Sequence, residues 1–391
     1  MSRVHVRSVS DLGSIFDGPH ATPKRTREGP YFLNITSLND GRLDLAQSDH
    51  VTAIDFGKWT RRVIPQKNDL LFSYETRLGQ AALMPSQVDA CLGRRMALLR
   101  PDPSVVDPRF LLYFYLSPSF QRIIEQRTIH GATVNRISLS SMGAWQVEIP
   151  DLREQRAIAE VLGALDDKIA ANTRLAYIAD ELVRTLHAQL EDSTQSSIVV
   201  GDVVRSVNER AEPASIDPAT AYVGLEHVPR RSMWLDRVGR AGSVTSAKSR
   251  FESGDILFGK LRPYFHKVVA APYSGVCSTD IIVLRPNVSG FSGFALAAIA
   301  SDRVVARCTA ASEGTRMPRT SWKDLATIKI GWPGEAAATA FSEEVEQIRD
   351  SASSAIQENI LLSATRDALL PHLMSGKLRV KDAEKIVSDR T

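Results

Sequence analysis

Residues 136–150 read Arg-Ile-Ser-Leu-Ser-Ser-Met-Gly-Ala-Trp-Gln-Val-Glu-Ile-Pro, and residues 319–333 read Arg-Thr-Ser-Trp-Lys-Asp-Leu-Ala-Thr-Ile-Lys-Ile-Gly-Trp-Pro. Each stretch runs into a long segment that favours a helix. Further matches lie upstream, all at offsets of 183 to 186 residues: 69–72 with 255–258, 99–101 with 284–286, and 131–133 with 314–316. A repeat with so long a period indicates two domains and excludes a solenoid. The chain is therefore a tandem duplication of a globular part followed by a helix.

Length and composition limit the class of protein. A chain of 391 residues favours two or three domains with cores of their own. Cys91, Cys277 and Cys308 lie far apart without a CxxC pair, so neither a disulfide framework nor a zinc site is expected. The chain start has no apolar signal segment, and no apolar run reaches the roughly 18 residues of a membrane span. We therefore expect a cytoplasmic protein without membrane association. The net charge of +3 allows nucleic-acid binding but does not argue for it.

Short β-branched and aromatic runs between turn residues predict strands in each half. The predicted strands are 63–64, 70–72 and 96–99 in the first half, and 222–223, 256–258, 267–270 and 281–284 in the second. One helix is predicted after each Leu-Arg-Pro, at 108–126 and at 291–305. This mixture indicates an α+β domain in each half.

Apolar residues recur every three or four positions at 158–190 and at 341–373, which places them on one face of a helix. About 40 residues at about 1.5 Å each make a helix roughly 60 Å long, and the simplest partner for each apolar face is the other helix. Asn172 and Asn359 occupy equivalent positions, where a polar residue fixes the register of a coiled coil. A partly exposed asparagine at a loose seam would show the same pattern. The connectivity favours an antiparallel pair.

The first of these helices contains a motif of a known family. Residues 151–169 read Asp-Leu-Arg-Glu-Gln-Arg-Ala-Ile-Ala-Glu-Val-Leu-Gly-Ala-Leu-Asp-Asp-Lys-Ile, and residues 369–378 read Leu-Leu-Pro-His-Leu-Met-Ser-Gly-Lys-Leu. They resemble the central helix and the C-terminal helix end of the DNA-specificity (S) subunit of type I restriction-modification systems. In the second half, Gly-Glu-Ala-Ala-Ala at 334–338 replaces the Leu-x-Glu-Gln opening. We therefore expect the two halves to hold their partners differently.

The resemblance implies an α+β fold with pseudo-two-fold symmetry and two mixed α/β target-recognition domains, at 1–150 and 193–333. Two long antiparallel helices, at 151–192 and 334–376, would form a coiled coil, followed by a tail at 377–391. Each recognition domain would read half of a split target in double-stranded DNA. The coiled coil would set the gap between the half-sites, at most about 18 base pairs for a rod of roughly 60 Å.

The resemblance also implies partner subunits. Two modification subunits would bind S-adenosylmethionine and methylate adenine, and restriction subunits would add a nuclease that uses ATP and Mg²⁺. The chain itself is expected to bind no cofactor.

The sequence lacks the motifs of the common enzyme classes. Residues 254–261, Gly-Asp-Ile-Leu-Phe-Gly-Lys-Leu, imitate a phosphate-binding loop but lack the Ser or Thr that would hold Mg²⁺. No GxGxxG precedes a helix, and no HExxH, GxSxG or Asn-Pro-Pro-Tyr-type methylation motif occurs. The eight histidines show no metal-ligand spacing. We expect no catalytic residue and no metal site, which argues against a stand-alone methyltransferase or nuclease.

Basic clusters with aromatic neighbours supply the candidates for DNA contact, because Arg and Lys suit phosphates while Arg, Asn and Thr suit base edges. The best placed are Arg77 and Arg262, just past equivalent strands, and the loops at 131–136 and 314–319. The full set is Arg25, Arg27, Arg77, Arg94, Arg95, Thr133, Asn135, Arg136, Arg230, Arg231, Lys260, Arg262, Arg316 and Arg319. Any single cluster is equally compatible with a solvated face, and the two loops would also suit contact with a modification subunit.

The helices supply the candidates for subunit and coiled-coil contacts. These are Leu152, Glu154, Gln155, Ile158, Leu162, Leu165, Ile169, Asn172, Leu175, Val345, Ile348, Asn359, Leu362, Leu369 and Leu373. The same features allow an alternative function, a coiled-coil scaffold that binds proteins through two globular docking modules. DNA binding that weakens with salt would separate the two functions.

Overall fold

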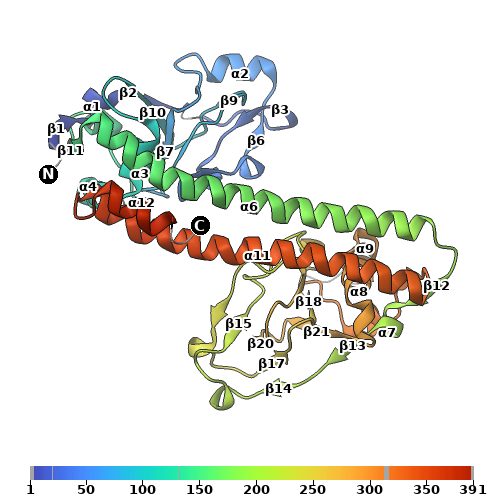
Figure 1. Ribbon diagram of the computed structural model, residues 1–391. Helices are drawn as coiled ribbons and strands as arrows, with labels where there is room; N and C mark the ends of the chain where they lie inside the picture. The colour runs from blue at the N-terminus through green and yellow to red at the C-terminus, as the bar shows by residue number, and fades with distance from the viewer. Residues whose placement is uncertain (1–3, 20, 132, 312–316, 389–391) are drawn as a thin grey trace. The chain divides into compact units, whose positions relative to one another are not determined.

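The computed structural model describes residues 4–19, 21–131, 133–311 and 317–388 (Figure 1). The chain divides into two compact units. Unit 1 comprises residues 1–168 and 361–391, and unit 2 comprises residues 169–360. Both long helices cross this division, so each unit holds one globular part and a portion of each helix.

A four-stranded antiparallel sheet forms the centre of unit 1. Its strand order is β2 (Gly13–Asp17), β10 (Met96–Pro101), β7 (Leu70–Ser73) and β8 (Ala81–Leu83). The apolar runs predicted as strands at 70–72 and 96–99 are the buried central strands of this sheet. Smaller elements complete the unit: the sheet β6 (Asp49–His50), β3 (Thr26–Phe32) and β9 (Ala90–Cys91), the pair β4 (Leu38–Asn39) and β5 (Arg42–Leu43), and the helices α1 (Val9–Leu12) and α2 (Ala53–Trp59).

Unit 2 repeats the central sheet with the same strand order. Its strands are β13 (Val204–Val207), β21 (Ile281–Pro286), β18 (Ile256–Gly259) and β19 (Val268–Ala270). A five-stranded sheet and a short helix complete the unit: β14 (Arg210–Ala211), β17 (Lys248–Phe251), β20 (Gly275–Cys277), β15 (Ala221–Val223), β16 (Gly239–Arg240) and α7 (Val200–Val203). Two copies of one sheet in a single chain confirm the duplication.

The repeat at 136–150 and 319–333 folds alike in both units, as a short helix followed by a strand. In unit 1, α5 (Leu139–Met142) precedes β11 (Gln146–Pro150), which pairs with β1 (Val4–Ser8). In unit 2, α10 (Trp322–Ala326) precedes β22 (Lys329–Gly331), which pairs with β12 (Ser197–Val199). Each strand ends within a few residues of a long helix, so the repeat joins the globular part to the helix.

The predictions of a single helix after each Leu-Arg-Pro are wrong. Each is a pair: α3 (Pro108–Leu116) and α4 (Pro118–Arg127) in unit 1, and α8 (Ser292–Ile299) and α9 (Asp302–Ala311) in unit 2. In unit 1 the break falls at Ser117, whose hydroxyl accepts a hydrogen bond from the Phe120 amide and so begins a new helix. Pro118 follows, and its missing amide hydrogen suits a first helical position.

The prediction of a strand at 63–64 is also wrong, since these residues belong to no strand. The reason lies in the next residue, Pro65, which has no amide hydrogen for a strand ladder.

The two long helical segments form α6 (Leu152–Asp192) and α11 (Glu335–Met374), and residues of the expected tail form α12 (Val380–Ser388). Inside unit 2 the two long helices run antiparallel. The amide of Asn172 donates to the Glu358 carboxylate at 2.6 Å, while the rings of His187 and Phe341 lie 6.0 Å apart. Residues early in one helix therefore meet residues late in the other.

Each of the two asparagines bonds to the opposite helix. Asn359 donates to the Ile169 carbonyl and to the Thr173 hydroxyl, both at 3.3 Å. Asn172 bonds to Glu358, and neither bonds to the other asparagine. The polar contacts across this seam are consistent with a register-setting role for both asparagines.

Part of the apolar stripe expected in α6 lies on the surface of unit 2. Leu175, Ile178 and Leu182 are 43%, 51% and 45% exposed, whereas Ala179 and Val183 are buried. The buried face packs into the core of the globular part, which includes Phe294, Ala295 and Val304. The face of α6 that is buried in the globular core, with Ala179 and Val183, is therefore about a quarter-turn away from the face that the spacing of large apolar residues predicts.

Candidate nucleic-acid interface

In unit 1 the turn after β7 lies against the loop at 131–136. The Thr76 amide donates to the Asn135 carbonyl at 3.0 Å, and Glu75 forms a β-bridge with Arg136. The guanidinium of Arg95 lies 3.1 Å from the Glu75 carboxylate and 3.3 Å from the Thr76 hydroxyl. Three predicted candidates from distant parts of the sequence, Arg95, Asn135 and Arg136, therefore lie together.

In unit 2 the turn after β18 makes the equivalent bonds. The Arg262 amide donates to the Pro318 carbonyl at 2.8 Å, and Leu261 forms a β-bridge with Arg319. Arg319 also lies 3.3 Å from the Asp280 carboxylate. The structure thus brings Arg262 and Arg319 together in the way that it brings Thr76 and Arg136 together in unit 1.

The backbone of both turns is strained at equivalent positions. Thr76 and Arg262 have φ angles of 68° and 51°, in the left-handed region that residues with a side chain rarely adopt. Arg95, Arg231 and His266 share this conformation, with φ angles of 71°, 53° and 53°. Such strain costs on the order of 1–3 kcal/mol per residue and clusters at functional sites. Its recurrence in both units points to a shared function for the two turns.

Some of the predicted DNA-contacting cations of unit 1 are bound to other groups of the protein, whereas others have exposed side chains. Arg77 is bound to the fold, because its guanidinium donates to the Ile35 carbonyl at 2.8 Å and to the Asn39 side-chain oxygen at 3.2 Å. Arg25 lies 3.2 Å from the Asp49 carboxylate. The candidates with exposed side chains are Arg27, Arg94, Thr133, Asn135 and Arg136.

A cavity of about 780 Å³ beside α2 joins two basic clusters of the sequence, Lys24-Arg25-Thr26-Arg27 and Arg61-Arg62. Lys24 lines it from the first cluster, and Arg61 and Arg62 line it from the second, together with the ring of Trp59. Arg62 is paired with Asp17 at 2.5 Å. The clusters near 24 and 61 therefore contribute to one basic surface of unit 1.

In unit 2, a 3₁₀ turn at Pro263–Phe265 presents cations and an exposed ring. The guanidinium carbon of Arg230 lies 3.9 Å from the centre of the Phe265 ring, and that of Arg262 lies 5.9 Å from it. Tyr264 is 52% exposed, and its ring meets Phe265 edge-on at 4.9 Å. Residues 262–266 are called the tip below.

The other predicted cations of unit 2 are partly engaged. Arg231 lies 3.0 Å from the Asp302 carboxylate, and the Lys260 ammonium donates to the Thr279 carbonyl at 2.7 Å. Arg316 lies outside the described residues.

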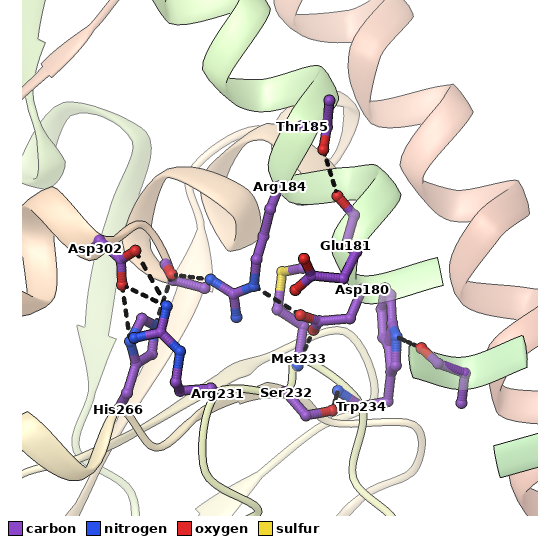
Figure 2. A network of polar contacts seen from close by, with 12 residues as sticks. Asp180, Glu181, Arg184, Thr185, Arg231, Ser232, Met233, Trp234, His266 and Asp302 are labelled. Carbon is purple, nitrogen blue, oxygen red and sulfur yellow. Dashed lines mark hydrogen bonds and ion pairs between the residues drawn. The ribbon is translucent and has the colours of Figure 1, made fainter. Parts of the chain in front are cut away.

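A buried polar network ties the tip to helix α6, as Figure 2 shows. Asp180 is 3% exposed and accepts hydrogen bonds at 2.6 Å from the Met233 amide and from the Arg184 guanidinium. Arg184 donates in turn to the Ala300 carbonyl at 2.8 Å, and His266 Nε2 bonds to the same carbonyl at 2.7 Å. The side chain of His266 therefore connects the tip to α6 through a single shared acceptor.

Burial lowers the pKa of His266 below its ordinary value, and the cations of Arg184 and Arg231 lower it further. The Asp302 carboxylate, 3.4 Å from His266 Nδ1, opposes this shift. His266 is therefore neutral at pH 7, and Nε2 is the nitrogen that donates to the carbonyl.

Sequence reasoning missed this network. Its only signal is an Asp and an Arg four residues apart, Asp180 and Arg184, within an otherwise apolar stripe. Such a pair is more often a surface ion pair, so the sequence alone does not reveal its burial.

The Leu-x-Glu-Gln opening of α6 contacts its own unit. Gln155 is 1% exposed and donates to the carbonyls of Pro150 and Val105, at 2.9 and 3.2 Å. Its side-chain oxygen accepts from the Asp107 amide at 2.9 Å, just before α3. Gln155 thus binds the start of α6 to the start of α3.

The other helix candidates differ in burial. The buried ones are Ile158, Leu162, Leu165, Ile169, Asn172, Val345, Leu362, Leu369 and Leu373. Leu152, Glu154, Ile348 and Asn359 are half-buried, and Leu175 is exposed.

The described residues offer little for catalysis. No group of three or more His, Cys, Asp or Glu side chains that could hold a metal ion occurs among them. All three cysteines are buried and free, and burial raises the pKa of Cys91 and Cys277 to about 12, which disfavours a nucleophilic thiolate. None of the helices in the described part of the chain combines the length and apolar character that a bilayer crossing requires.

Comparison with known proteins gives one consistent family. Residues 1–177 match the type I restriction modification DNA specificity domain. The putative type I restriction enzyme MjaX specificity subunit of Methanocaldococcus jannaschii is 22% identical, over 96% of this chain and 94% of the relative. The type I restriction enzyme EcoDI specificity subunit of Escherichia coli is 23% identical, over 63% of this chain and 64% of the relative.

A solved structure has a similar fold. The crystal structure of a type I restriction-modification S subunit from M. genitalium superposes with a TM-score of 0.59 at 18% identity, covering 95% of this chain and 96% of that one. The match extends over both units and both long helices, as the duplicated architecture predicts. Residues 1–177 thus carry the type I restriction modification DNA specificity domain, and nearly the whole chain is similar to specificity subunits of type I restriction-modification systems.

Proposed function

We propose that the chain is the non-catalytic DNA-reading subunit of a type I restriction-modification complex and that each unit reads one half of a split target. The duplicated strained turn supports this proposal. Unit 1 places Thr76-Arg77-Leu78 where unit 2 places Arg262-Pro263-Tyr264. Equivalent backbones with different side chains suit the reading of two different base sequences.

Each unit is proposed to use its cations in two ways. Exposed cations such as Arg27 and Arg94 contact phosphates and set the position of the unit on the duplex. Residues at the turns, such as Asn135 and Arg136, contact base edges in the major groove. The hydrogen bonds from Arg77 to Ile35 and Asn39 give Arg77 the role of holding the turn in place.

The exposed apolar stripe of Leu175, Ile178 and Leu182 is proposed as a docking surface for a modification subunit. Three large apolar side chains on one helix face are unusual on a free surface and mark an interaction site when they are contiguous. The modification subunits, two for each chain, would bring S-adenosylmethionine, and restriction subunits would bring ATP and Mg²⁺. The assembled complex would act in the cytoplasm.

The decisive experiment is DNA binding by the full chain, alone and with its modification subunits. The target is first identified by long-read methylome sequencing of cells with and without the chain. We expect target binding to weaken steeply as salt rises, and Arg262→Ala to reduce the salt dependence by about one phosphate contact or relax specificity at one position.

Lys323→Ala is the matched control, since Lys323 is an exposed cation of unit 2 on α10, outside the candidate set. It should leave both affinity and specificity unchanged. Absence of target binding, or binding that ignores salt, would favour the protein-docking scaffold instead.

A further inference from the structure

The tip of unit 2 exposes one aromatic ring and covers its neighbour. Phe265 lies beneath the guanidinium of Arg230, whereas Tyr264 is 52% exposed. An exposed aromatic ring gains favourable apolar contact when another flat ring stacks on it and excludes water. Tyr264 is thus the side chain of the tip that is available for a new contact.

The backbone that holds Tyr264 is rigid. Pro263 precedes it, and the Phe265 and His266 amides donate back to the carbonyls of Arg262 and Pro263, both at 2.8 Å. The Arg231 amide donates to the His266 carbonyl at 2.9 Å. Little conformational entropy is therefore lost when the ring of Tyr264 binds.

The network of Figure 2 fixes the end of the tip to the rest of unit 2. His266 Nε2 bonds to the Ala300 carbonyl, which is also held by Arg184 on α6. The left-handed conformations of Arg262 and His266, at either end of the 3₁₀ turn, are kept in place by these bonds. Strain that surrounding structure maintains in this way is typical of a binding site.

The charge around the ring is positive. The Asp302 carboxylate offsets the charge of Arg231. In the described part of the chain, Arg230 and Arg262 have no carboxylate within ion-pair distance, and both lie over the face of Phe265. The exposed ring of Tyr264 meets Phe265 edge-on, so both cations lie close to it, which fits a base together with its neighbouring phosphates.

We propose that Tyr264 enters a groove of the half-site read by unit 2 and stacks on a base, while Arg230 and Arg262 contact the flanking phosphates. This inference rests on the proposed function and adds to it a residue and a mode of contact. Inserted side chains partly unstack a base step, so the step that they enter must be deformable. At the equivalent position unit 1 has Leu78, so aromatic stacking is confined to one half-site.

The test uses the full chain with its modification subunits and the target duplex found by methylome sequencing. 2-Aminopurine, a fluorescent adenine analogue that stacking quenches, is placed at successive positions of both half-sites. We expect binding to change the fluorescence at one position of the second half-site. Tyr264→Ala and Tyr264→Leu should abolish that change, and Tyr264→Phe should retain it. We expect Tyr264→Ala to bind the target about tenfold more weakly, as for loss of one stacked base.

Tyr177→Ala is the matched control, because Tyr177 is a 65% exposed tyrosine of unit 2 on α6. It should leave the fluorescence pattern and the affinity unchanged. Tight binding by Tyr264→Ala with an intact fluorescence pattern would overturn the stacking role and leave the proposed function standing. A wild-type complex that binds no duplex would overturn both.

Discussion

At the scale of single residues, the pair Asp180 and Arg184 is an ion pair in which both side chains are largely buried. Their side chains are 4% and 18% exposed, and the guanidinium and carboxylate are 2.6 Å apart. Buried ion pairs contribute little net stability, but removing one partner leaves the other charge uncompensated. Substitution of either partner is therefore expected to destabilise unit 2, whereas substitution in an exposed ion pair would change stability little.

Asp180→Ala should lower the free energy of unfolding by about 3 kcal/mol. The substitution removes the acceptor for the Met233 amide and the partner of Arg184 at once. Urea unfolding of the full chain measures the effect. Glu181→Ala, at the exposed neighbouring position, is the control and should change stability by less than about 0.5 kcal/mol. Equal effects of the two substitutions would show that the network does not hold the fold.

His266 predicts a pH dependence of stability. Its folded pKa lies below the ordinary value of 6.5, mainly because of burial. His266 therefore binds a proton more tightly in the unfolded chain than in the folded chain. The stability that neutral His266 contributes is lost as pH falls below about 6.5. We expect the melting temperature of the wild type to fall more between pH 7.5 and pH 5.5 than that of His266→Asn, since asparagine tolerates the left-handed backbone. Identical slopes for the two proteins would refute this assignment.

At the scale of elements, helix α6 has two apolar faces in unit 2. One carries Ala179 and Val183 into the core, and the other exposes Leu175, Ile178 and Leu182. Sequence spacing found the apolar residues and could not tell which face the globular part would cover. Small side chains at 176 and 179 permit close packing there, which leaves the larger ones outside.

Ile178→Glu should prevent co-purification of the modification subunit without lowering the melting temperature of the chain. A charge in the middle of an apolar interface is costly to desolvate, whereas a charge at an exposed helix position is not. Ala188→Glu, also exposed on α6 but outside the face of Leu175, Ile178 and Leu182, is the control and should leave assembly intact. Normal recovery of the modification subunit with Ile178→Glu would rule out this face as the docking surface.

At the scale of the whole molecule, two units of the same architecture are joined by two continuous helices. If these helices set the distance between half-sites, their length and the gap in the target must change together. Insertion of one heptad into both α6 and α11, at 168–169 and 360–361, lengthens each helix by about 10 Å, or about three base pairs.

We expect modification subunits in complex with this variant to methylate sites whose half-sites are unchanged and whose gap is about three base pairs longer. Methylome sequencing of cells that express the variant measures the gap directly. Insertion of seven residues at the exposed turn 253–254 of unit 2 is the control, which should leave the gap unchanged. An unaltered gap in the helix variant would contradict a spacing role for the helices.

Much of the candidate site could be predicted from the sequence, because basic clusters beside strand ends are visible there. Arg95 and the loop that carries Asn135 and Arg136 are separate candidates in the sequence and lie together in the fold, as do Arg262 and Arg319. The inward ties of Arg77, the exposure of Tyr264 and the burial of Asp180 could not be predicted. Each depends on residues far away in the chain, and repeat analysis contains no information on those contacts.

The duplication, the central strands of each sheet and the two long helices follow from the amino-acid sequence alone. These follow from patterns between neighbouring residues and between two copies of one unit, which can be read without knowing how any element packs. The break within each helix pair, the apolar face of α6 that stays exposed and the network that holds the tip depend on how the chain packs in three dimensions. Long-range packing decides which face of an element is buried. The turns of the two units have the same backbone conformation but carry different side chains.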